Sequence, residues 1–138
     1  MTRSLGIMVA AALLLCGCSR PMDFEKFVKS SDAVADNYDF EISVLDTLST
    51  YDLSFYTRID RPVFRRQEAS MKLIVKWISP SGAVGGEVVY MDVSKAAEAY
   101  RSGVSFRQTG NWILSVKVAD PPEGLRGLGL AYTENGTR

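Results

Sequence analysis

The stretch that decides the fold is Tyr-Asp-Phe-Glu-Ile-Ser-Val, residues 38–44, in which polar and apolar side chains alternate one by one. Successive side chains on a β-strand point to opposite faces, so Phe40, Ile42 and Val44 share one face. Asp39 and Glu41 lie on the other face, where we expect them to be solvated. This pattern predicts a half-buried strand of an antiparallel sheet.

The same alternation continues along most of the chain. It predicts strands over residues 51–59, 71–78, 87–93, 112–118 and 125–133, and a short strand over Val104–Gln108. Ser94–Arg101 is the one convincing helical stretch, with Ser94 as its N-cap. Strands separated by turn residues at near-regular spacing predict an all-β fold, an antiparallel β-sandwich of about six or seven strands with one short helix. An open barrel is the second possibility.

The strand registers also predict the core. The inward positions are Phe40, Ile42, Leu53, Phe55, Leu73, Val75, Trp77, Val89, Trp112, Leu114, Val116, Leu128 and Leu130. In the last strand, Gly127, Gly129 and Ala131 occupy the face opposite these leucines. A face without side chains lets another backbone approach closely.

The N-terminal sequence indicates a lipoprotein signal. Arg3 is followed by an apolar run over residues 5–15, which is too short for the roughly 20 residues that span a bilayer. Leu15-Cys16-Gly17-Cys18 then has the form of a lipobox, in which a peptidase cuts before Cys18 and that thiol carries the lipid. An ordinary secretory signal is the alternative. We therefore expect a signal peptide over residues 1–17, a lipidated segment over 18–37 that is a tether or a short helix, and a β-sandwich over 38–138.

The residues after Cys18 bear on location. Ser19 stands where an Asp usually marks retention in the inner membrane, which favours the outer membrane. Arg20-Pro21-Met22 lacks the acidic cluster of a surface-export tag, so the periplasmic face is favoured over the cell surface. Two or more acyl chains such as palmitate make a stable membrane anchor, whereas a single chain is marginal.

Composition excludes several classes of function. Basic and acidic residues number 16 each, which argues against a nucleic-acid partner. The chain has no histidine, and its two cysteines are Cys16 and Cys18. The commonest general base, the commonest metal ligand and cysteine chemistry are therefore missing from the mature chain. We expect a non-enzymatic protein with no catalytic residue, no metal site and no cofactor.

A basic segment is the predicted contact surface for a protein partner in the cell envelope. It is formed by Arg58, Arg61, Phe64, Arg65 and Arg66, which surround Pro62 and Val63. Arg and aromatic residues are enriched at the energetic centres of interfaces. The alternative is a solvated hairpin end whose apolar residues fold back onto the core.

Several short motifs occur in a fixed order along the chain. They are Asp46-Thr47, Tyr51-Asp52-Leu53, Arg58, Pro80-Ser81-Gly82, Phe106–Gly110 with Trp112, and Leu125-Arg126-Gly127-Leu128. In order and rough spacing this segment resembles the gliding-motility lipoproteins (GldH type) of Gram-negative bacteria. The resemblance implies a non-enzymatic, lipid-anchored component of a membrane-associated motility or surface assembly, without a cofactor.

Two other functions are compatible with the sequence. Trp77, Trp112, Tyr90 and Tyr132 would form a sugar-stacking platform in an envelope-anchored carbohydrate-binding module, if they were exposed and coplanar. A carboxylate-based hydrolase would need two acids facing each other at about 5–10 Å.

Overall fold

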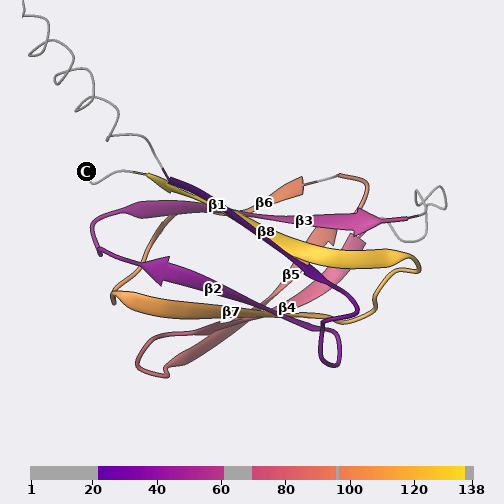
Figure 1. The fold of residues 1–138 in the computed structure, drawn as a ribbon, viewed down its shortest axis with the longest axis horizontal. Helices are drawn as coiled ribbons and strands as arrows, with labels where there is room; N and C mark the ends of the chain where they lie inside the picture. Colours follow the sequence, from indigo (N-terminus) through magenta and orange to yellow (C-terminus); the bar gives the residue numbers. More distant parts are fainter. Residues whose placement is uncertain (1–21, 61–69, 96, 136–138) are drawn as a thin grey trace, which may run out of the picture.

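Two four-stranded antiparallel sheets face each other in this protein (Figure 1). The computed structural model describes residues 22–60, 70–95 and 97–135, which form eight strands and no helix. In the first sheet the order is β1 (Met22–Lys29), β8 (Leu125–Asn135), β3 (Thr50–Ile59) and β6 (Ala97–Ser105). In the second it is β2 (Asn37–Val44), β7 (Gly110–Val118), β4 (Ser70–Ile78) and β5 (Val84–Asp92). The predicted all-β sandwich is confirmed, with eight strands in place of six or seven.

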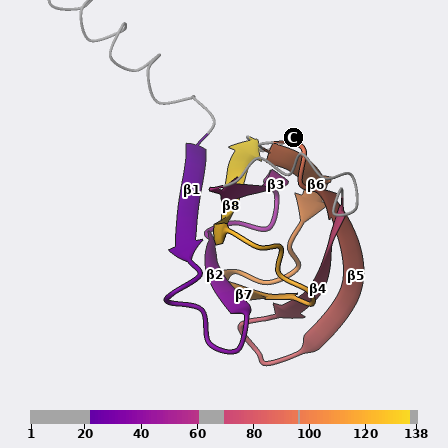
Figure 2. The same cartoon turned by 90° about the vertical axis from the view of Figure 1, so that its right-hand side faces the viewer.

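The pairing of strands is mostly nonlocal. Among the strands of the described residues, only β4 and β5 form a hairpin between consecutive strands, while β1 pairs with β8 and β2 pairs with β7. Viewed end-on, β1 and β2 lie along one side of the sandwich and β5 and β6 along the other (Figure 2). The edge strands β5 and β6 follow each other in sequence but belong to different sheets.

The core lies between the two sheets and follows the alternation of the sequence. Most predicted core residues are buried, including Phe40, Ile42, Leu114 and Leu128 at 0–1% exposure. Trp77, Val89 and Trp112 are only half-buried and pack against the edge of this core. The core also contains buried residues outside the predicted set, which are Tyr38, Val44, Tyr51, Met71, Met91, Phe106, Val118 and Tyr132.

The predicted helix over Ser94–Arg101 is wrong, because Ala97–Ser105 forms strand β6. The Asp92 carboxylate accepts hydrogen bonds from the backbone N–H and the hydroxyl of Ser94, at 2.9 and 2.6 Å. Ser94 therefore belongs to a turn that carries the chain from β5 into β6, and it does not cap a helix. The Ala-Glu-Ala-Tyr sequence favours a helix locally, but pairing with the edge of β3 overrides that preference.

The segment expected as a tether or short helix contains strand β1, which pairs with β8 along its whole length. The spacing of Phe24, Phe27 and Val28 fits a helix face, yet in the strand Phe27 points away from the other two. Phe24 stacks on Tyr132 at a centroid distance of 4.8 Å. Phe27 stacks on Tyr56 of β3 at 5.9 Å, across the glycine face of β8.

The bare face of β8 makes this packing possible. A Cβ added at Gly127 would lie 2.3 Å from the carbonyl oxygen of Val28, and one at Gly129 would lie 2.0 Å from the ring of Tyr56. The predicted close approach is therefore confirmed, by backbone at Gly127 and by an aromatic ring at Gly129.

We predict that Gly127→Ala destabilises the domain by about 1–3 kcal/mol, because a backbone carbonyl would have to move away from the new methyl group. Gly85→Ala is the matched control, since a Cβ at that strand position meets nothing within 4 Å. The control should be neutral or more stable by up to about 1 kcal/mol. Denaturant unfolding measures both, and equal midpoints for the two variants would contradict the packing described for β8.

Candidate functional site

Strand β5 carries a carboxylate on its inward face, at the side of the sandwich where β5 and β6 are the edge strands of the two sheets. Glu87 alternates with Val89 and Met91, so it points between the two sheets. A half-buried carboxylate is costly unless hydrogen-bond donors surround it. In this structure the donors come from β6 of the opposite sheet.

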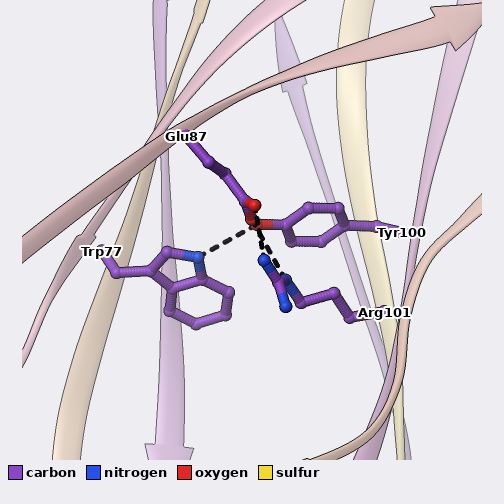
Figure 3. Close-up of polar contacts among 4 residues, drawn as sticks. All are labelled: Trp77, Glu87, Tyr100 and Arg101. Carbon is purple, nitrogen blue, oxygen red and sulfur yellow. Dashed lines mark hydrogen bonds and ion pairs between the residues drawn. The ribbon is translucent and has the colours of Figure 1, made fainter.

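Four side chains form a continuous hydrogen-bonded chain across this edge (Figure 3). Arg101 donates through Nε to Oε1 of Glu87 at 3.1 Å and through Nη2 to Oε2. The Tyr100 hydroxyl also donates to Oε1 of Glu87, and it accepts a hydrogen bond from Nε1 of Trp77 at 3.0 Å. These hydrogen bonds link β4 and β5 of one sheet to β6 of the other, and so connect the two sheets at this side of the sandwich.

A β-bulge in β6 explains how two neighbouring residues reach the same carboxylate. Leu53 of β3 pairs with Arg101 and Ser54 pairs with Ala99, which leaves Tyr100 as an extra residue. In a regular strand Tyr100 and Arg101 would point to opposite faces, whereas a bulge redirects one of them. A second register shift follows near Gly103, whose φ is +65° and whose N–H donates to Asp52 at 2.8 Å.

The electrostatics of the cluster favour a fixed ion pair. Burial raises the pKa of Glu87, but hydrogen bonds from Arg101 and Tyr100 outweigh it, and the pKa lies below its ordinary value. The hydrogen bond to Glu87 raises the pKa of Arg101, and burial together with the Glu87 contact raises that of Tyr100. All three groups therefore keep one protonation state near neutral pH, which suits binding better than proton transfer.

Next to this cluster lies an open pocket of about 590 Å³, which we call the aromatic pocket. Its wall is formed by Trp77, Phe106 and Trp112, with ring centroids 5.8 Å apart for the first pair and 5.1 Å for the second. Gly85 pairs with Trp77 across β4 and β5, and its missing side chain leaves the space beside the indole open. Nε1 of Trp112 donates to the carbonyl oxygen of Gln108 at 3.0 Å, which fixes that ring as well.

The sugar platform of four aromatic residues, which was the alternative to a place in the core, is not formed. Tyr132 is buried in the core, and Tyr90 is 63% exposed on the outer face of β5. Only Trp77 and Trp112 share a site, where they belong to a tilted wall and not to a flat surface. Asp39 and Glu41 are exposed on the outer face of β2, as expected for solvated residues.

The predicted lipidation site and most of the basic segment lie outside the described residues. These are Cys18, Arg61, Phe64, Arg65 and Arg66. Arg58 is exposed on the outer face of β3, where its guanidinium lies 5.7 Å from the ring centroid of Phe27. It lines a separate hollow of about 790 Å³ together with Lys29 and Arg126. The structure thus places Arg58 and the aromatic pocket on different parts of the domain.

Sequence reasoning missed Glu87, Tyr100 and Arg101. A glutamate at an inward position of an otherwise apolar strand is the one pattern that could have identified Glu87. Tyr100 and Arg101 were not recognised as the partners of Glu87, because both lie in the segment predicted as a helix. A β-bulge also produces no recognisable change in the alternation of polar and apolar residues.

The chain matches no model of a known protein family, and no curated protein is significantly similar to it.

Within the described part of the chain, no acidic or cysteine residues cluster in a group of three or more that suits a metal ion. The same residues contain no helix of the length and apolarity that crossing a membrane requires.

The low pKa of Glu87 predicts an acid-sensitive contribution to stability. Because the folded-state pKa is below the ordinary 4.5, the ion pair stabilises the fold fully above about that pH and loses its effect as pH falls further. Between pH of about 7 and about 3, wild type should lose up to about 1 kcal/mol more stability than Glu87→Gln. Glu41→Gln, on the exposed face of β2, is the control. Identical losses in Glu87→Gln and wild type would contradict a stabilising pair.

Proposed function

We propose that this protein is a lipid-anchored, non-enzymatic component of a Gram-negative cell envelope, which binds an envelope ligand in the aromatic pocket. The observation that carries this proposal is that the tryptophan side chains lining the pocket are held in place by hydrogen bonds within the protein. Both tryptophans of the chain line it, and hydrogen bonds within the protein hold both indoles. Its volume lies within the usual range of about 300–1,000 Å³ for small-ligand sites.

The fixed rings support binding for an energetic reason. Ordering flexible side chains on binding costs about 0.5–1.5 kcal/mol for each one, and rings already held in place avoid most of that cost. The ion pair of Glu87 and Arg101 likewise holds its polar atoms at the edge of the pocket before a ligand arrives. A preformed apolar wall with a few oriented polar groups is the usual composition of a ligand site.

The sequence supports the cellular setting of this function. The lipobox that ends at Cys18 favours an acyl anchor. Ser19 favours the outer membrane, and Arg20-Pro21-Met22 favours its periplasmic face. The resemblance to gliding-motility lipoproteins supports a role inside a membrane-associated motility or surface assembly. In that setting the ligand of the pocket is a segment of a partner protein, and the basic segment around Arg58 is a second predicted contact.

A carbohydrate-binding module is the second candidate, and one observation favours it. Two half-buried indoles border the same open space as the polar groups of Glu87, Arg101 and Gln108. An aromatic face can pack against the C–H face of a sugar ring while such polar groups bind its hydroxyls.

The anchor is tested at the lipobox. Cys18→Ala should abolish palmitate incorporation and leave an unprocessed precursor or a soluble form, because the acylated thiol is lost. Cys16→Ala is the control and should keep both palmitate and membrane association. Metabolic labelling and membrane fractionation measure the two effects. A Cys18→Ala protein that remains fully acylated would refute the assignment.

The pocket is tested by photo-crosslinking in living cells. A photoreactive amino acid in place of Arg107, an exposed residue that lines the pocket, should give a specific adduct. Gly85→Leu should remove most of that adduct, because a Cβ at this position meets no described atom within 4 Å and the longer side chain would occupy the space beside Trp77. The same amino acid in place of Val34, on the distant β1–β2 loop, is the control and should give none.

The composition of the adduct separates the two candidates. An adduct that proteases digest identifies a protein partner, as the assembly proposal expects, whereas one shortened only by glycan-cleaving enzymes identifies a carbohydrate ligand. If Gly85→Leu folds normally and its adduct is undiminished, the aromatic pocket is not the binding site.

A further inference from the structure

The turn between β2 and β3 presents two leucines to the outside. Leu45 is 71% exposed and Leu48 is 68% exposed. Single exposed leucines are common on protein surfaces. These two differ because they stand three residues apart on one short turn whose shape is fixed.

The Asp46 side chain fixes this turn. Its Oδ1 accepts hydrogen bonds from the backbone N–H of Leu48 at 2.5 Å and of Ser49 at 2.9 Å. Its Oδ2 accepts another from the Ser49 hydroxyl at 3.0 Å. An aspartate used in this way forms a local turn that satisfies the backbone, so the two leucines are held outward and not folded onto the core.

The turn lies at the end of the sandwich where β1 begins. Met22 of β1 pairs with Glu134 of β8, which in turn pairs with Tyr51 at the start of β3. Figure 1 shows the β2–β3 turn at the same end as the start of β1 and the end of β8. Phe24, which is 44% exposed, is near this end too.

The covalent chain keeps this end close to the lipid. Four residue steps separate Cys18 from Met22, and a fully extended chain covers at most about 14 Å in that distance. A lipid on Cys18 therefore holds the start of β1, and the exposed leucines at the same end of the sandwich, within a short distance of the bilayer surface. Interfacial segments bury their apolar side chains about 5–10 Å into the boundary between headgroups and acyl chains.

We propose that Leu45 and Leu48 enter the boundary between headgroups and acyl chains of the leaflet that holds the Cys18 lipid. They would act as a second, non-covalent contact with the membrane. This inference rests on the proposed lipid anchor. It also predicts the orientation of the domain. Gly110 pairs with Val44, so the β6–β7 connection lies at the same end, and the aromatic pocket that it lines is held near the membrane surface.

The experiment uses the full chain, acylated in cells and reconstituted in vesicles of phosphatidylethanolamine and phosphatidylcholine. Once the signal peptide is removed and Cys18 is acylated, Leu48→Cys provides a single free thiol for an environment-sensitive fluorophore such as nitrobenzoxadiazole. We expect its emission to shift to the blue in vesicles, and lipids with a quencher on the acyl chain to reduce its intensity. Val34→Cys is the matched control, because Val34 is 78% exposed on a loop at the opposite end. Its emission should stay that of a label in water.

The outcomes separate this inference from the anchor itself. Palmitate incorporation is measured on each labelled protein. Acylated Leu48→Cys protein whose emission matches that of the Val34→Cys control would overturn the membrane contact and leave the anchor intact. Protein without palmitate would overturn the anchor, and the membrane contact with it.

Discussion

The Glu87 carboxylate on an edge strand is the constraint on which the side of this domain that carries the aromatic pocket depends. A charge between two sheets must be matched by donors, and here the donors come from the opposite sheet. A bulge in β6 makes that match possible, because it turns both Tyr100 and Arg101 toward one carboxylate. The ion pair is partly exposed and contributes little to stability, so its main effect is geometric. It joins the two sheets at one place and leaves the aromatic pocket open beside it.

The two sides of the sandwich differ in what packs against the glycines of their strands. On the β1 side, small residues of β8 allow Phe27 and Tyr56 to lie flat across the sheet, so the outer surface there is closed by aromatic packing. On the β5 side, Gly85 plays the opposite role. No described residue lies within 4 Å of a Cβ built there, and the indole of Trp77 lines the pocket beside it. Glycines in strands thus allow close packing on β8 and leave the aromatic pocket open beside β5.

The sequence predicted the parts of the fold that depend on alternation. Strands β2, β3, β4, β5, β7 and β8, and most of the predicted core residues, follow from side chains that point inward at every second position. Strands β1 and β6 could not be predicted, because their segments carry helix-like spacing or strong helix formers and become strands only through pairing with β8 and β3. The candidate site could be predicted only in part, for the same reason. Trp77 and Trp112 were visible as aromatic positions, whereas the contact of Glu87 with Arg101 depends on a bulge and on which two edges meet in space.

Hydrogen–deuterium exchange of the protein, in membranes from the cells that produce it and in detergent, tests the proposal that the aromatic pocket holds an envelope ligand. We expect backbone amides of residues 84–87 and 104–108, which border the pocket, to exchange more slowly in the membrane. Gly85→Leu should lose that protection while its core strands exchange as in wild type. Equal exchange of these segments in membrane and detergent, or protection that persists in Gly85→Leu, would contradict the account.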